Sequence, residues 1–357
     1  MLFLLNDLKT LFKNKHVVVM GDSVQRCVYK DLVLALQEKR LLKSDELKSK
    51  GEETFCNDKL LFRSELNNGR NFVEIREYQS EDNFHLVQFY FLTRCYSERM
   101  EAILDEFKRE PPDLIIMNSC MWDISRYGPN GEDEYYDNMN KLCTRFREVL
   151  PPSTMFLWTT TLPISSHIAS GFLLENIRFL AETLRVAVLE ANYYVTQIVT
   201  AYGFDVLDLH YYMRALINHR EKDGCHWDNF ANRHITDLIS VFLHDSWGLP
   251  LPPFAVQQIQ KSDLKLDLRH FTYEGHPNFV TSKKRRLEKL AEGAAVNEDC
   301  DEEEESESSD SMNGNVEEDV PNGIEDDGHE NGTDENLDLG PAFLPCSVTP
   351  PSDGEIF

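Results

Sequence analysis

The sequence has no closely spaced pair of cysteines. Successive cysteines lie at least 23 positions apart, at 27, 56, 95, 120, 143, 225, 300 and 346. This spacing excludes a CxxC redox motif and the ligand pattern of a zinc finger. Histidines and carboxylates also lack ligand spacing, so we expect no metal and no cofactor. Cys27 and Cys143 lie in apolar, helix-like patterns, which is typical of reduced, buried thiols in an intracellular protein.

Long hydrophobic runs are absent as well. The opening run MLFLL is only five residues long, is interrupted by Asn6 and Asp7, and has no basic region before it, unlike a signal peptide. No other window has the length needed to span a membrane. We therefore expect a soluble, intracellular protein with no membrane partner. The basic cluster KKRR at 283–286 fits either a nuclear localisation signal or a solvated linker. The expected location is therefore the cytoplasm, with the nucleus as the alternative.

Basic residues are missing from the last part of the chain. Residues 291–357 contain 22 Asp and Glu and no Lys or Arg, whereas residues 1–290 contain 40 acidic and 36 basic side chains. So polar a segment cannot bury enough apolar surface to fold, and we expect a disordered acidic tail. We place one globular domain at 1–250, a Pro-containing, basic linker at 251–290 and the tail at 291–357. The acidity disfavours nucleic-acid binding and suits a basic protein partner for the tail.

Apolar, β-rich runs alternate with helical patterns through the first 245 residues. The runs lie at 16–20, 85–92, 113–118, 154–161 and 204–209, and the helical patterns at 24–38, 98–108, 134–149, 172–201 and 228–244. This alternation predicts an α/β fold with three layers, in which helices cover both faces of a mostly parallel sheet of about five strands. Residues 39–83 fit less well, and NFVEIREYQS ahead of NFHLVQFYF predicts an antiparallel hairpin at the sheet edge.

Chemically useful side chains follow several of these runs. The first run ends in Gly-Asp-Ser23, the third ends at Asn118, and the region after the fifth contains Asp223 three residues before His226. Ligands bind at the carboxyl ends of parallel strands, so these residues are expected to meet. A serine needs a base to take its proton, and an imidazole needs a carboxylate to fix its tautomer. The Gly-Asp-Ser motif also has a structural interpretation without catalysis, because Asp and Ser commonly cap the start of a helix.

The order of these pieces resembles the SGNH or GDSL hydrolase superfamily, with a nucleophile in an N-terminal GDS block and a C-terminal DxxH block. The segments GDSVQRCVYKDL, NSCMWD and DGCHWD resemble the PC-esterase family more specifically, over roughly residues 14–245. The resemblance implies a flavodoxin-like α/β/α fold and an acyl esterase. By the same resemblance Ser23 is the nucleophile, His226 the general base and Asp223 its orienting partner.

The start of a helix at Ser23 offers unpaired N–H groups to an oxyanion, and the resemblance implies two further donors, a glycine N–H and a side-chain amide. Two departures concern these further donors of the oxyanion hole. The second block of the superfamily supplies a glycine, but the second parallel run here ends LTRCYS. In the third block the amide position aligns either with Asn118 or with Trp122, and we prefer Asn118 because only it carries a suitable donor. Arg26 and Arg94 are candidate cationic substitutes for the missing glycine, with surface or ion-pair arginines as the alternative reading.

Two functions from different classes remain open. One is a serine esterase that hydrolyses O-acyl esters on a small molecule, a glycan or a modified protein. The other is a catalytically inactive relative that keeps the fold as an interaction module and uses the acidic tail for a basic partner. The missing second-block glycine favours the module, and the presence of Ser23, Asp223 and His226 favours the esterase. A nucleotide-binding protein is disfavoured because the first turn lacks a glycine-rich loop.

Overall fold

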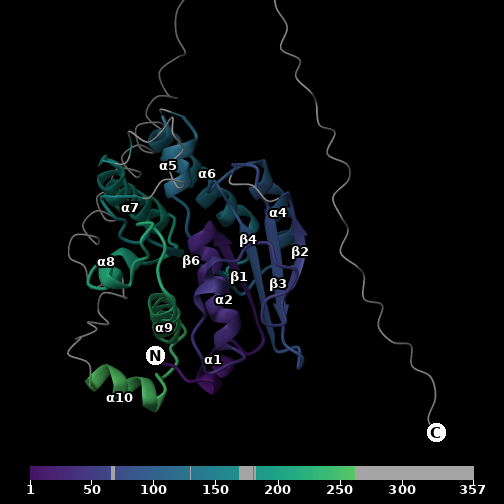
Figure 1. The fold of residues 1–357 in the computed structure, drawn as a ribbon. Helices are drawn as coiled ribbons and strands as arrows, with labels where there is room; N and C mark the ends of the chain where they lie inside the picture. The colour runs from purple at the N-terminus through teal and green to yellow at the C-terminus, as the bar shows by residue number, and fades with distance from the viewer. Residues whose placement is uncertain (66–68, 129, 169–179, 181, 262–357) are drawn as a thin grey trace, which may run out of the picture. The chain divides into compact units, whose positions relative to one another are not determined.

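The computed structural model describes residues 1–65, 69–128, 130–168, 180 and 182–261 (Figure 1). The strands of these residues form a single sheet in the order β2-β3-β4-β1-β5-β6-β7. Their bounds are β1 Lys15–Gly21, β2 Lys59–Arg63, β3 Glu74–Gln79, β4 His85–Phe91, β5 Leu114–Met117, β6 Met155–Thr159 and β7 Asp205–Leu207. The helices are α1 Leu5–Leu11, α2 Ser23–Ala35, α3 Ser44–Lys48, α4 Glu98–Arg109, α5 Met121–Arg126, α6 Gly131–Val149, α7 Leu184–Ala201, α8 Leu209–Met213, the 3₁₀ helix η2 Ile217–His219, α9 Asn229–Ser246 and α10 Pro253–Lys261.

The parallel part of the sheet has the flavodoxin-like strand order. Strands β4, β1, β5, β6 and β7 run parallel, and numbering these five along the chain gives the order 2-1-3-4-5. The predicted mostly parallel sheet is therefore confirmed, and so is the antiparallel hairpin, which is formed by β3 and β4. Strand β2 was not expected; it pairs antiparallel with β3 and makes the sheet seven-stranded.

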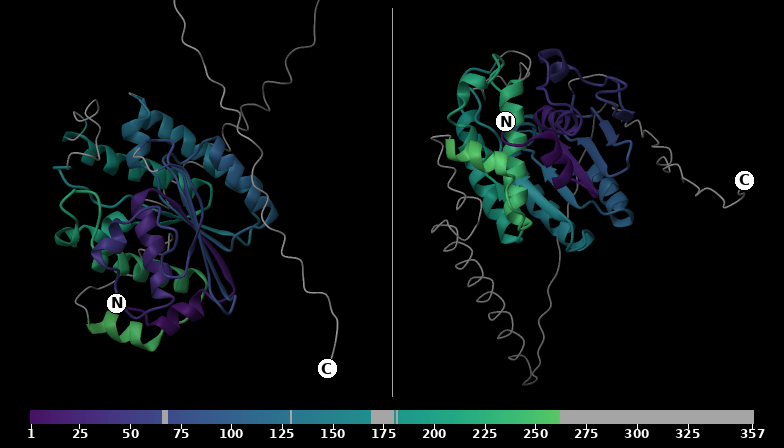
Figure 2. Two further views of the ribbon diagram at one scale, coloured as in Figure 1. Left: turned by 45° about the vertical axis from the view of Figure 1, so that its right-hand side comes forward. Right: turned by 90° about the horizontal axis from the view of Figure 1, so that it is seen from below.

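Both faces of the sheet are apolar because each central strand is buried on both sides. In β1, Val17 and Val19 belong to the core that α1, α2 and α9 cover, whereas Val18 and Met20 belong to the core under α4, α6 and α7. Figure 2 shows the helices on opposite sides of the twisted sheet. This arrangement is the expected three-layer fold.

The structure differs from the expected ranges near the end of the globular part. Helix α7 begins at Leu184, and most of the remainder of the range expected to be helical lies outside the described residues. Helix α10 lies inside the range expected to be a linker, and its Ala255 is buried in the core. The rest of that linker, the KKRR cluster and the acidic tail lie outside the described residues, so the three domain ranges stay predictions.

Candidate active site

The turn between β1 and α2 places Ser23 at the carboxyl edge of the sheet. Gly21 has φ +147°, and a Cβ there would lie 2.4 Å from the backbone oxygen of Asn118, so glycine allows the ends of β1 and β5 to approach. Asp22 is the N-cap of α2, because its carboxylate accepts a 2.8 Å hydrogen bond from the Val24 N–H. Ser23 is the first residue of the helix. Its hydroxyl is therefore not needed to cap it.

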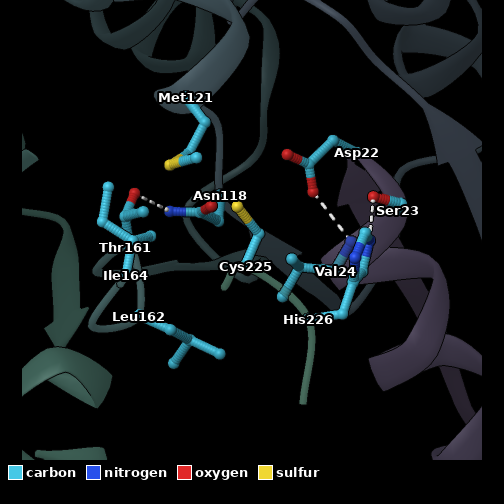
Figure 3. Close-up of a pocket in the computed structure, with 10 residues that line it drawn as sticks. All are labelled: Asp22, Ser23, Val24, Asn118, Met121, Thr161, Leu162, Ile164, Cys225 and His226. Atoms are coloured by element: carbon cyan, nitrogen blue, oxygen red, sulfur yellow. Dashed lines mark hydrogen bonds between the residues drawn. The ribbon is translucent and has the colours of Figure 1, made fainter. Parts of the chain in front are cut away.

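The Ser23 hydroxyl instead meets an imidazole from far along the chain. Ser23 Oγ lies 2.7 Å from His226 Nε2, and His226 Nδ1 lies 2.6 Å from Asp223 Oδ2 (Figure 3 shows Ser23 and His226). With the Nδ1 proton directed at the carboxylate, Nε2 has its lone pair available for the serine proton. The structure thus brings together the three residues that the GDS and DxxH motifs suggested. Their catalytic roles remain a proposal.

A tight loop holds the Asp223 and His226 side chains in register. Asp223 Oδ1 accepts hydrogen bonds of 2.9 Å from the N–H groups of both Cys225 and His226. The Glu221 N–H donates to the His226 carbonyl at 2.8 Å and closes the loop. Gly224 has φ +85°, and a Cβ there would lie 2.6 Å from the His167 carbonyl oxygen, so a glycine is required at this turn as well.

The electrostatic environment favours an ionised carboxylate beside the imidazole. Burial by itself raises the pKa of Asp223, but hydrogen bonds from the His226 ring and from the N–H groups of Cys225 and His226 outweigh it and hold the pKa below its ordinary value. Burial lowers the pKa of His226, but the hydrogen bond and the charge of Asp223 outweigh it and raise the pKa overall. Asp223 is therefore ionised throughout the neutral range and supports a more basic His226.

A small, largely apolar pocket opens beside Ser23. It holds about 370 Å³ of empty space, including its open mouth, and is lined by Asp22, Ser23, Val24, Asn118, Met121, Thr161, Leu162, Ile164, Cys225 and His226 (Figure 3). The lining comes from the ends of β1, β5 and β6 and from the loop that carries His226. Such a lining suits a small apolar group beside Ser23.

Asn118 lines this pocket, but its amide is used elsewhere. Its Nδ2 donates to the Thr159 carbonyl at 2.8 Å and to Thr161 Oγ1 at 3.1 Å, so both amide protons are directed to the end of β6. Figure 3 shows the amide nitrogen directed toward Thr161. Asn118 therefore stands beside the nucleophile, as expected from the sequence, but needs to rotate before it can donate to an oxyanion at Ser23.

The two candidate arginines are both in ion pairs. Arg26 is 6% exposed and its guanidinium lies 3.2 Å from Glu74 of β3. Arg94 pairs with Glu134 of α6. Neither residue lines the pocket. The ion-pair alternative weighed for these arginines is thus the arrangement that the structure shows.

Several residues of the site were not expected from the sequence. Asp22 was not singled out as the cap that releases Ser23, although Gly-Asp-Ser before a helical pattern offers two candidate caps. Thr161 and Cys225 line the pocket without belonging to a chemical motif that would have identified them.

Among the residues that the structure describes, no group of three or more His, Cys, Asp or Glu side chains is placed to hold a metal ion. Within the same residues, no helix combines the length and apolarity needed to cross a membrane.

Comparison with curated proteins shows clear sequence relatives. The chain is 44% identical over 251 residues to PC-esterase domain-containing protein 1A of Mus musculus, an alignment that covers 69% of this chain and 56% of that protein. It is 42% identical over 253 residues to PC-esterase domain-containing protein 1B of Homo sapiens, covering 69% of this chain and 58% of that protein. The expected resemblance to the PC-esterase family is confirmed. The chain spans somewhat more than half the length of these relatives, and no protein-family model matches it.

Comparison with solved structures gives more distant similarities. A GDSL-like lipase from Bacteroides thetaiotaomicron matches with a TM-score of 0.40 and 12% identity, covering 65% of this chain and 89% of the lipase. A catalytic mutant of the acetylxylan esterase Axe2 from Geobacillus stearothermophilus matches with a TM-score of 0.39 and 11% identity, covering 67% of this chain and 96% of that enzyme. A peptidoglycan O-acetylesterase matches with a TM-score of 0.43 and 8% identity, covering 68% and 95% of the two chains.

Proposed function

We propose that this relative of the PC-esterase domain-containing proteins is a serine esterase that hydrolyses O-acyl esters through Ser23, His226 and Asp223. The observation that carries the proposal is the 2.7 Å contact between Ser23 Oγ and His226 Nε2, with Asp223 at 2.6 Å from the other ring nitrogen. The names of the similar PC-esterase domain-containing proteins also support an ester hydrolase. The substrate class is an acylated small molecule or glycan.

The chemistry follows from the order of the contacts. As Ser23 Oγ attacks the acyl carbonyl carbon, His226 Nε2 takes the hydroxyl proton, and Asp223 stabilises the resulting imidazolium. His226 then gives this proton to the leaving alcohol oxygen, which leaves an acyl group on Ser23. A water molecule attacks that acyl group, with His226 again accepting and returning the proton, and releases the carboxylic acid.

The oxyanion of the tetrahedral intermediate needs hydrogen-bond donors. Ser23 is the first residue of α2, where N–H groups lack partners within the helix and the helix dipole favours negative charge. The Ser23 N–H is therefore the first donor in this proposal. Asn118 becomes the second donor if a bound ester turns its amide away from Thr159 and Thr161. One such donor is worth about 3–4 kcal/mol of barrier.

An inactive interaction module is the second candidate, and one observation favours it. Both amide protons of Asn118 are engaged with β6, and neither Arg26 nor Arg94 lines the pocket. On this reading the site lacks a second oxyanion donor, and the acidic tail binds a basic partner.

We also propose an intracellular location, since all six cysteines of the described residues are free thiols, as a reducing compartment requires.

Ester hydrolysis by matched histidine variants tests the proposal. A second histidine–carboxylate pair lies in the same loop, with His219 Nδ1 at 2.8 Å from Asp228 Oδ2, and it does not line the pocket. We expect Ser23→Ala and His226→Ala to abolish hydrolysis of p-nitrophenyl acetate and of an acetylated oligosaccharide. His219→Ala is expected to keep it. If Ser23→Ala hydrolyses these esters as fast as the unmodified protein, or if the unmodified protein hydrolyses none, the interaction module takes the place of the esterase.

A further inference from the structure

Three arginines gather around two aromatic rings outside the pocket. The guanidinium carbons of Arg70 and Arg94 lie 5.2 Å and 4.4 Å from the centre of the Tyr127 ring. The guanidinium carbon of Arg126 lies 3.7 Å from the centre of the Trp122 ring. We call Arg70, Arg94 and Arg126 the arginine cluster. Stacking on aromatic rings orients these planar guanidinium groups.

Hydrogen bonds join the separate segments that carry this cluster. Thr93 Oγ1 donates to the Arg70 carbonyl at 2.9 Å and also lies 2.8 Å from the Tyr127 hydroxyl. Arg70 Nη1 donates to the Arg126 carbonyl at 3.4 Å. The cluster is therefore assembled from three parts of the chain that are distant in sequence and held together by these contacts.

The cluster lies at the same edge of the sheet as Ser23. Arg94 follows the end of β4, and Arg70 precedes β3, whose first residues pair with the last residues of β4. Helix α5 connects the cluster to the pocket, because Met121 lines the pocket and Arg126 ends the same helix, about 7.5 Å further along its axis. Burial lowers the pKa of Arg126, and the negative charge of Asp22, beside Ser23, partly opposes this shift.

Two acidic groups near the cluster, Glu134 and Asp123, are engaged in contacts of their own. Glu134 pairs with Arg94, whose side chain remains 25% exposed. Asp123 is buried and accepts hydrogen bonds from Ser119 Oγ and the Cys95 N–H. The exposed Arg70 has no carboxylate partner among the residues that the structure describes. A stacked guanidinium retains N–H groups at its edge, and their fork geometry matches the oxygens of a carboxylate, sulfate or phosphate.

We propose that the arginine cluster binds an anionic group, such as a phosphate, sulfate or carboxylate, on the alcohol part of the ester whose acyl carbonyl is held at Ser23. The inference rests on the proposed esterase function and narrows its substrate class to anionic esters. Because the cluster lies outside the pocket but at the same edge of the sheet as Ser23, its contacts strengthen substrate binding without entering the chemical step.

A pair of acetyl esters that differ in charge tests the inference. The probes are phenyl acetate, which is neutral, and 4-acetoxyphenyl phosphate, and the variants are Arg70→Gln, Arg94→Gln and their combination. Each single variant is expected to raise KM for the phosphate ester about tenfold with little change in kcat, and to leave the neutral ester unaffected. Arg109→Gln, at the end of α4 and thus at the opposite edge of the sheet, is the control and is expected to change neither. Arg70→Lys should retain part of the preference, because the charge remains while the fork geometry is lost.

The outcomes separate this inference from the esterase proposal. If Ser23-dependent hydrolysis occurs but the double variant keeps the ratio of kcat/KM between the two esters, the cluster is only a stacked structural element and the inference fails. If neither ester is hydrolysed, the esterase proposal fails. Calorimetric titration of the unmodified protein and the double variant with 4-acetoxyphenyl phosphate then decides the anion site on its own. Equal affinity, or no binding to either, overturns it.

Discussion

Replacing Asp223 with asparagine removes the charge behind the imidazole while keeping the shape of the loop. The asparagine oxygen can still accept the two 2.9 Å hydrogen bonds from the Cys225 and His226 N–H groups. What changes is the 2.6 Å contact with His226 Nδ1, where an amide can present an N–H to the ring. Because Nδ1 then accepts a hydrogen bond, the ring proton moves to Nε2, which faces Ser23. In this tautomer His226 cannot act as the base for the serine proton.

The expected loss of rate is large and the expected loss of stability is small. In a Ser-His-Asp triad this change lowers kcat by about 10⁴-fold, which corresponds to about 5.4 kcal/mol of barrier. The Asp223 and His226 side chains are 41% and 33% exposed, so solvent screening limits the contribution of their ion pair to folding to about 0–1 kcal/mol. A large kinetic effect with a nearly unchanged urea midpoint is therefore the signature of the proposed role.

The pH dependence gives a second readout with a definite sign. Asp223 raises the pKa of His226, and a general base must be neutral, so kcat/KM of the unmodified protein is expected to fall as the pH drops through a value above about 6.5. In Asp223→Asn this acidic limb is expected to move to lower pH. The pair also stabilises the fold between the pKa values of the two groups, and this contribution disappears as the pH rises through the folded-state pKa of His226 or falls through that of Asp223.

Initial rates of p-nitrophenyl acetate hydrolysis between pH 5 and 9, with urea denaturation on the same samples, measure both effects. Asp228→Asn, in the neighbouring histidine–carboxylate pair, is the control for rate. Asp228 also caps α9, but asparagine caps a helix about as well as aspartate, so little loss of stability and no loss of kcat are expected there. If Asp223→Asn keeps both the rate and the position of the acidic limb, the reasoning about this carboxylate is refuted.

Three further predictions concern the residues around Ser23. Asp22→Ala removes the α2 cap and is expected to lower the free energy of unfolding by about 0.5–2 kcal/mol in urea denaturation, with Ser23 still reactive; unchanged stability would mean that the cap contributes nothing. Gly21→Ala forces a Cβ to within 2.4 Å of the Asn118 oxygen at φ +147° and is expected to cost more than the about 1–3 kcal/mol of backbone strain alone, so a thermal melt like that of the unmodified protein contradicts the geometry. Asn118→Ala is expected to lower kcat by about 10²–10³-fold if the amide turns to the oxyanion, whereas a loss of stability with full kcat would assign it only to holding β6.

The sequence indicated the sheet well because burial on both faces leaves a strong pattern. The five runs expected as parallel strands are β1, β4, β5, β6 and β7, and the β3–β4 hairpin was also expected. Strand β2 is mostly exposed and carries no alternating apolar pattern, and α5 and α8 have only six and five residues, so propensity gave little signal for them. Such short elements form because the tertiary structure holds them.

The sequence predicted which residues form the candidate site, but it did not predict all the hydrogen bonds and ion pairs that their side chains make. Ser23 and His226 are 203 positions apart, and their expected meeting rested on motif resemblance and on the rule for strand ends. The direction of the Asn118 amide depends on Thr159 and Thr161, which belong to another strand end and carry no motif. The ion pairs of Arg26 and Arg94 likewise join segments that lie about 40–48 positions away, which local patterns do not reveal.

Covalent labelling of the nucleophile tests the central claim most directly. The unmodified protein is treated with a fluorophosphonate, digested and analysed by mass spectrometry, alongside His226→Ala and His219→Ala. We expect a single stoichiometric adduct on Ser23 that disappears in His226→Ala and persists in His219→Ala, because His226 Nε2 lies 2.7 Å from Ser23 Oγ whereas His219 does not line the pocket. The absence of an adduct from folded, unmodified protein, or an adduct on a different serine, would contradict the assignment of Ser23 as an activated nucleophile.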